Sequence, residues 1–353
     1  MSNSFMDTNS CNALWGMVVD YMFENRSSDG SFKTMYLQPY YHPSEGWMKY
    51  PVNSNFCSAS VAVNLLHAKE EPKIAELLKS SVQFLLSNSF RGKLWSFGAI
   101  DKKYRVPNDS DTTSMSSFFL GSMGIKIPNR KILMRQKENG VFKLWISDQY
   151  LSIYSFADYI SILYYNKMVK KCKPLQNKHI DLDDHEVIVD CNNLLYLGLK
   201  DNQDVFEKVS KQVLNNLKET TYYTTYVQEV YHICRLHYYD IVNLKKENRL
   251  YDTIIERLYD FYNSSYRKDN LLDDLYFLIS LLYLEERAFI QEIDTDKFIE
   301  ESYKRKLYET VEPFYTSNNK LDINPKTKEP ATFFGSDIYT SSLYIEFLSL
   351  YKG

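Results

Sequence analysis

Glycine and proline are scarce in this chain, with 11 and 10 copies in 353 residues. Both residues interrupt regular structure, and here they lie mostly between stretches of helical periodicity. Runs that alternate apolar and polar residues, as half-buried strands do, are weak throughout. The scarcity therefore favours a helical protein over one built from strands and tight turns.

Other absences narrow the class of protein further. The five cysteines are odd in number and form no CxxC pair, so we expect neither a disulfide framework nor a zinc cluster. A net charge of −3 gives no basic field for nucleic acid. No apolar run approaches the length of a membrane span, and the first residues lack the regions of a signal peptide. We expect a cytoplasmic protein with reduced thiols and no transmembrane segment.

The chain is rich in aromatic residues, with 30 Tyr, 20 Phe and 4 Trp. Its 44% hydrophobic and 25% charged residues are otherwise ordinary for a globular protein, and its length allows a large core. The aromatic surplus has two readings, a compositional bias and the lining of a cavity. Composition does not separate them.

Two kinds of helix alternate along the sequence. One kind is charged with a single apolar stripe, which is typical of a helix with one wet face. The other is apolar or small-sided nearly all round, which is typical of a buried helix. The first kind covers residues 13–24, 72–88, 147–165, 202–217, 247–263 and 296–311. The second covers residues 58–67, 112–123, 187–199, 225–238, 271–284 and 337–350.

The alternation predicts an all-α fold, an (α/α)6 toroid of six outer and six inner helices in a single domain over residues 1–353. An open helical solenoid is the main alternative. The apolarity of the inner helices and the aromatic surplus favour the closed ring. Because the helices alternate in direction, all six inner helices would begin at one end of the barrel. The polar turns before them would surround one cavity mouth, where ligand sites commonly form.

One of these turns carries two carboxylates, Asp109 and Asp111, within the sequence Asp-Ser-Asp-Thr-Thr that opens the second inner helix. Asp and Ser at the start of a helix commonly cap its free backbone N–H groups. The same pair could instead hold an acidic proton beside an apolar surface. That combination suits the protonation of an alkene, which is weakly basic and does not leave an apolar phase.

Residues 107–114 resemble the aspartate-rich motif of class II terpene cyclases, the group of squalene–hopene and drimenyl diphosphate cyclases, in its Asp-x-Asp-Thr-Thr form. Residues 333–343 look like the closing repeat of those barrels. The resemblance implies that Asp111 is the general acid, that Asp109 holds it in its proton-donating geometry, and that Thr112 and Thr113 add hydroxyls to the same network.

The resemblance also implies a linear isoprenoid substrate, with a prenyl diphosphate expected. Protonation needs no cofactor, although a diphosphate substrate could bring Mg²⁺. Most such cyclases add a second helical domain, whereas this chain has the length of one toroid. A single toroid must close its cavity with its own loops, a protein partner or another copy of the chain.

Substrate-binding candidates follow from the predicted chemistry. A carbocation is stabilised by aromatic faces, and a diphosphate by cations. Arg235 interrupts a buried stretch and therefore needs an anionic partner, either Glu229, Asp190 or a ligand phosphate. Each aromatic residue taken alone is more often a core or surface residue than part of a site. The predicted set is Trp47, Trp95, Phe97, Arg105, Phe118, Tyr222, Tyr226, Arg235, Phe334 and Asp337.

Three other functions fit a toroid. A protein prenyltransferase subunit would need zinc, and Cys191, Cys234, His185 and His232 lack a recognisable ligand spacing. A carbohydrate-active barrel would pair carboxylates across the cavity, with Asp111 facing Asp190, Asp274 or Asp337. A non-catalytic toroid would bind lipid or peptide, and its two motif aspartates would be helix caps.

Overall fold

The computed structural model describes residues 8–39, 47–98, 108–146, 186–215, 226–263, 271–316 and 333–352. A ring of six inner helices forms the centre of the molecule. Each helix packs on the next in chain order, and the last packs on the first, so the ring is closed. The six are α2 (Asn55–Leu65), α4 (Ser110–Ser122), α7 (Val187–Leu197), α9 (Tyr226–Tyr238), α11 (Leu271–Tyr283) and α14 (Asp337–Lys352). Closure confirms the toroid and rules out the open solenoid.

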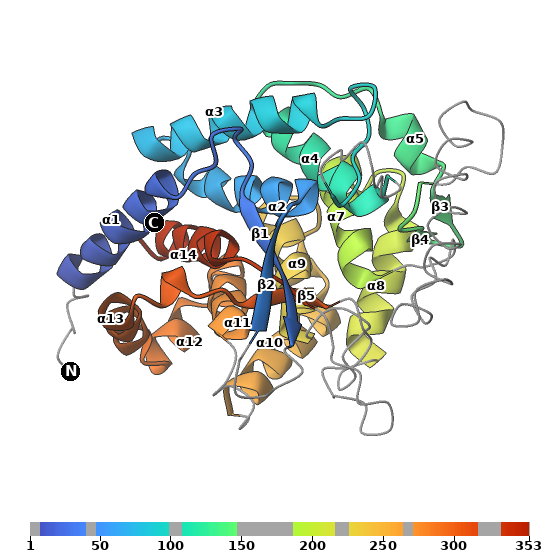
Figure 1. Cartoon of the computed structure of the whole chain (residues 1–353). Helices are drawn as coiled ribbons and strands as arrows, with labels where there is room; N and C mark the ends of the chain where they lie inside the picture. Colours follow the sequence, from blue (N-terminus) through green and yellow to red (C-terminus); the bar gives the residue numbers. More distant parts are fainter. Residues whose placement is uncertain are drawn as a thin grey trace.

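The outer layer surrounds this ring, as the rim of helices in Figure 1 shows. It contains α1 (Thr8–Glu24), α3 (Pro72–Ser87), α8 (Gln203–Asn215), α10 (Asn248–Asn263) and α13 (Thr295–Arg305). The remaining predicted outer helix, over 147–165, lies outside the described residues. Shorter helices are α5 (Arg130–Met134), α12 (Arg287–Glu292), η2 (Leu66–Ala68), η4 (Leu244–Lys246) and η6 (Leu307–Glu309).

Burial follows the two sequence patterns. On the outer helix α3, the apolar stripe through Ile74, Leu78 and Leu85 is buried. On the inner helix α2, every residue except Phe56 is buried. Such a helix has no polar face that could be exposed to water, so it must lie in the inner layer of the fold. None of the described helices is both long and apolar enough to cross a membrane.

A small antiparallel sheet was not predicted from the sequence. Its strands, in the order β2-β1-β6-β5, are Trp47–Asn53, Lys33–Pro39, Phe333–Gly335 and Pro313–Thr316. The pairing of Met35 with Gly335 joins the first and last repeats of the ring. In Figure 1 the sheet crosses the front of the barrel. A second hairpin pairs β3 (Lys137–Glu138) with β4 (Val141–Phe142). These strands are short, and the main sheet joins distant segments, so local periodicity carries little sign of them.

Three inner helices open with the same side-chain cap. In each, an oxygen of the residue before the helix accepts a backbone N–H from the first turn. The pairs are Ser54 with Cys57 at 3.1 Å, Asp109 with Thr112 at 2.6 Å, and Ser336 with Tyr339 at 3.1 Å. The capping interpretation of Asp109 is therefore confirmed, and the ring places its cap at the end of the barrel where the inner helices begin.

Candidate active site

Asp109 lies at the start of α4 in a closely packed turn. Its Oδ1 accepts the Thr112 N–H, and its own N–H donates to the Trp95 carbonyl at 3.0 Å. The residue is 3% exposed. Its second carboxyl oxygen, Oδ2, is buried and has no hydrogen-bond partner within the described ranges. A buried, unpartnered carboxyl oxygen is costly as an anion, so this position favours the protonated acid.

Asp111 lies in the first turn of α4 and reaches the neighbouring inner helix. Its Oδ1 accepts a hydrogen bond from Nδ2 of Asn192 on α7 at 2.7 Å. Asn192 is buried, whereas Asp111 keeps part of its surface accessible. Of the two motif carboxyls, that of Asp111 therefore belongs to the less buried residue.

The two carboxyls hold protons at unusually high pH. Burial, and then the charge of Asp111, raises the pKa of Asp109 to about 8. Burial also raises the pKa of Asp111 to about 6, and the Asn192 hydrogen bond limits that rise because it favours the anion. The pair therefore retains a proton near neutral pH, and Asp111 is its more acidic member.

The two threonines of the motif do different things. The Thr112 hydroxyl is buried next to Asp109 and, like the Thr112 N–H, lowers the pKa of that carboxyl. The Thr113 hydroxyl accepts the N–H of Trp95 and donates to its carbonyl, both at 3.1 Å. The expectation that Thr113 joins the carboxyl network is therefore wrong. Its side chain ties α4 to the strand-like segment before it.

The predicted aromatic residues whose side chains are described lie in different parts of the barrel. The Trp95 indole is fully buried and donates to the Leu85 carbonyl of α3, so it faces the outer layer. Phe97 stacks on Phe56 at a centroid distance of 5.7 Å, at the end of the barrel where α2 begins. Phe118 meets Tyr239 edge-on at 5.1 Å, farther along α4.

Tyr226 begins α9, and its hydroxyl is buried without a hydrogen-bond partner among the described residues. Burial raises the pKa of this hydroxyl, while the charge of Arg257 on the outer helix α10 lowers it. Trp47 and Phe334 lie on β2 and β6 at the sheet end of the barrel, where only the backbone is described. Arg105 and Tyr222 lie outside the described residues.

Asp337 faces outward rather than into the barrel. Its Oδ2 accepts the hydroxyl of Tyr21 on the outer helix α1 at 2.6 Å. Asp190, at the start of α7, accepts the N–H of Phe142 at 2.6 Å. The hydrogen bonds of these two carboxyls are thus made to residues other than Asp111, and Asp274, the third carboxyl of the carbohydrate-active alternative, lies in the first turn of α11.

Arg235 has a structural partner that the sequence analysis did not name. Its Nη2 lies 3.5 Å from the Glu346 carboxylate of α14 and donates to Oδ1 of Asn64 on α2 at 2.7 Å. The expected partners Glu229 and Asp190 are therefore wrong. Because α2 and α9 stand opposite each other in the ring, the bond from Arg235 to Asn64 crosses the barrel axis.

Further buried groups complete this axial polar cluster. The Tyr231 hydroxyl donates to Glu346 at 2.7 Å, and the Tyr283 hydroxyl donates to its other oxygen. His67 Nε2 lies 3.7 Å from the same carboxylate. We use the name axial polar cluster below for Asn64, His67, Tyr231, Arg235, Tyr283 and Glu346.

Sequence reasoning missed Asn192 and Glu346. Glu346 carried a usable signal, because a single charge within the apolar run Leu343 to Leu348 needs a buried partner. Asn192 carried none, because many inner-helix amides look alike until the ring is closed. Among the described residues, no group of His, Cys, Asp and Glu could hold a metal ion. The four described cysteines, Cys11, Cys57, Cys191 and Cys234, are free.

The fold is an α/α toroid, and the carboxyl pair lies at the end of the barrel where the inner helices begin. No protein-family model and no curated protein sequence matches the chain. Among solved structures, it is similar to a variant of the type II terpene cyclase MstE from Scytonema, in complex with its substrate geranylgeranyl dihydroxybenzoate. The TM-score is 0.62 at 11% identity, and the likeness covers 97% of each chain.

This likeness confirms, at the level of fold, the resemblance stated from the sequence. The two chains are also of similar length, because the likeness covers 97% of the cyclase chain as well. A second solved structure, an unsaturated glucuronyl hydrolase specific for heparin, has a TM-score of 0.43 at 8% identity, covering 97% of this chain and 96% of that one.

Proposed function

We propose that this protein is a class II terpene cyclase-like enzyme that protonates an alkene of a linear isoprenoid and so starts its cyclisation. The observation that carries the proposal is the pair Asp109 and Asp111, two carboxyls at the start of one inner helix whose pKa values burial raises to about 8 and about 6. The shared fold with a type II terpene cyclase supports it.

Asp111 is the general acid in this proposal. It is the accessible member of the pair, and as the stronger acid it gives up its proton more readily. Since Asn192 occupies Oδ1, the transferable proton resides on Oδ2. Asp109 caps the helix, and the charge of Asp111 adds to burial in keeping the Asp109 carboxyl protonated.

The substrate class proposed is a linear isoprenoid with a polar head group. A prenyl diphosphate remains the predicted substrate, and such a substrate could bring Mg²⁺. The related fold binds a geranylgeranyl chain on a dihydroxybenzoate, which has no diphosphate. Both head groups therefore belong in the test.

The experiment incubates the protein with farnesyl diphosphate, geranylgeranyl diphosphate and geranylgeranyl dihydroxybenzoate, and then looks for cyclic products by mass spectrometry. We expect Asp111→Asn to lower conversion at least about 100-fold, the usual contribution of a general acid. Asp204→Asn is the matched control, because Asp204 lies in the first turn of the outer helix α8 and pairs with Lys137 at the surface.

The pH dependence provides a second readout. Asp111 must be protonated to act, so activity should fall as pH rises above about 6. Failure to convert all three substrates, or equal conversion by wild type and Asp111→Asn, would overturn the proposal.

A further inference from the structure

A large basin opens at the end of the barrel away from Asp111. It has a volume of about 1000 Å³, within the range of small-molecule sites. Its walls come from the ends of the inner helices: Leu66 and His67 after α2, Tyr238 and Tyr239 at the end of α9, and Tyr283 at the end of α11. The function proposed above does not use this basin.

The basin is separated from the carboxyl pair by the axial polar cluster. Arg235 and Asn64 lie near the far ends of α9 and α2, about 14 Å beyond the helix starts at 1.5 Å per residue. Their hydrogen bond joins opposite sides of the ring. A ligand in the basin therefore would not reach Asp111 along the axis.

One wall of the basin is aromatic. The ring of Tyr238 lies 5.0 Å from that of His67, 4.7 Å from that of Tyr283 and 5.2 Å from that of Tyr239. Tyr238 is nevertheless 43% exposed, although the other rings of the group are more deeply placed. A large aromatic ring held in position by its neighbours and left open to solvent is a surface on which a planar group can stack.

The charged groups of the basin favour an anion. Four of its side chains are cationic, Lys69, Lys245, Lys246 and Arg287, and two are carboxylates, Asp240 and Glu285. Lys245 pairs with Glu285 at 2.8 Å, and Arg287 donates to the carbonyls that end α14. Lys69 and Lys246 form no ion pair within the described residues, so two ammonium groups remain for a ligand.

We propose that this basin is a second ligand site, which binds a small organic anion that carries a planar ring. The ring stacks on Tyr238, and the anionic group lies between Lys69 and Lys246. A nucleoside monophosphate and an aromatic carboxylate share this chemistry. The site is independent of the cyclase proposal because the axial polar cluster lies between the two.

The test is calorimetric titration of the full chain with adenosine monophosphate, 4-hydroxybenzoate and inorganic phosphate. We expect at least one of the two ring-bearing anions to bind with a Kd below about 1 mM. Which of them binds more tightly identifies the kind of ligand. Binding should weaken about ten-fold in Tyr238→Ala, from the loss of stacking, and also in Lys246→Gln.

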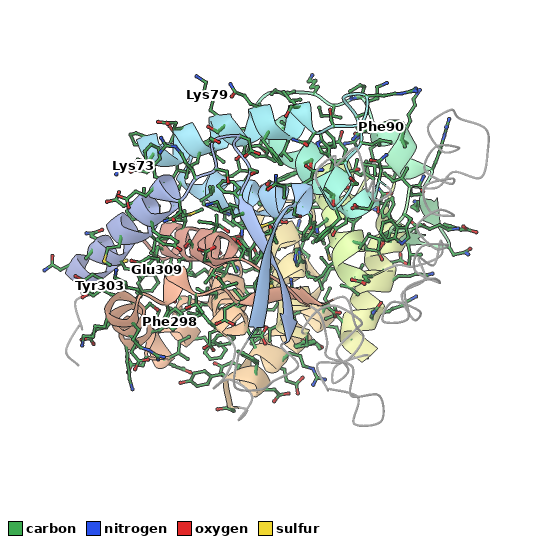
Figure 2. The ribbon with its side chains drawn as sticks, in the orientation of Figure 1. Lys73, Lys79, Phe90, Phe298, Tyr303 and Glu309 are labelled. Carbon is green, nitrogen blue, oxygen red and sulfur yellow. The ribbon has the colours of Figure 1, made fainter. Side chains whose placement is uncertain are left out.

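The controls are matched by residue type on other surfaces. Tyr303→Ala removes a 38% exposed tyrosine of α13, and Lys79→Gln removes an exposed lysine of α3. Figure 2 shows both at the edge of the molecule. Asp111→Asn should bind as wild type does. The proposal is overturned if neither ring-bearing anion binds, if phosphate alone binds as tightly, or if the control variants weaken binding equally.

Discussion

Asp109 and Asp111 lie where the inner helices begin. The Asn192 amide of α7 donates a hydrogen bond to Asp111, and Oδ2 of Asp109 has no hydrogen-bond partner among the described residues. Farther along the barrel, Glu346 is surrounded by two tyrosine hydroxyls, an arginine and a histidine. Both regions bury charge, but only in the second does a buried carboxylate lie beside a buried group of opposite charge. The difference separates a site that can hold a proton from a cluster that stabilises the barrel.

The comparison is tested most strongly at Glu346. Glu346→Gln would leave Arg235 buried without a carboxylate, and we expect it to lower the free energy of unfolding by about 3–5 kcal/mol. Urea denaturation measures this change. The double variant Arg235→Met/Glu346→Leu should recover most of the loss, since a buried pair replaced by apolar residues is often neutral. A single-variant loss below about 1 kcal/mol would show that the cluster is not essential to the barrel.

At the acidic end, the amide of Asn192 should control acidity more than stability. Asn192→Leu removes the hydrogen bond that favours the Asp111 anion, so the pKa of Asp111 should rise. Such a bond contributes about 1.5–3 kcal/mol, which corresponds to one to two pH units. The high-pH limit of activity should shift upward by that amount. An unchanged pH profile would mean that Asn192 does not tune the acid.

The closed ring and the helix cap on which this comparison depends could be predicted from the sequence. The helix types predicted the closed ring, because a helix apolar all round must be buried, and the polar turn predicted the cap at Asp109. The contacts across the ring were not predictable. The partners Arg235 and Glu346 are 111 residues apart, and Asp111 and Asn192 are 81 apart. Local periodicity places each residue on a helix, but does not determine which helix it faces.

Buried carboxyls that form no ion pair among the described residues should also make the stability of the protein depend on pH. Burial raises the folded-state pKa of Asp109 and of Asp190 to about 8, above the ordinary value near 4. The folded state thus binds more protons than the unfolded state, and stability falls as pH rises toward 8. Burial lowers the pKa values of His67 and His232, so these histidines change the pH dependence of stability only below about pH 6.5.

Between pH 6.5 and 8, each of the two carboxyls should therefore cost up to about 1.4 kcal/mol per pH unit. Asp109→Asn should remove its share of this slope, as measured by urea denaturation at several pH values. Asp294→Asn is the matched control, because Asp294 caps the outer helix α13 in the same manner. A slope that Asp109→Asn leaves intact would show that Asp109 is not the protonated carboxyl.

A variant of Thr113 tests whether every residue of the motif takes part in proton transfer or whether some only stabilise the fold. Thr113→Val keeps the shape of the side chain but leaves the buried N–H of Trp95 without its partner and removes one of the two donors to the Trp95 carbonyl. We expect a loss of about 1–2 kcal/mol in the free energy of unfolding. Turnover per folded molecule should stay the same, because the hydroxyl does not contact either carboxyl. A large loss of turnover without a loss of stability would instead place Thr113 in the proton-transfer network.

The smallest effect is expected at Asp337, which like Asp111 lies in the first turn of an inner helix but is turned toward the outer layer. Tyr21→Phe removes the hydroxyl that donates to Asp337, and water can replace it because the site is only partly buried. The loss should be about 0.5–1 kcal/mol. If conversion of an isoprenoid also fell in this variant, Asp337 would act on the substrate, and the distinction between inward and outward carboxyls would fail. Measuring turnover and unfolding on the same preparation separates these outcomes.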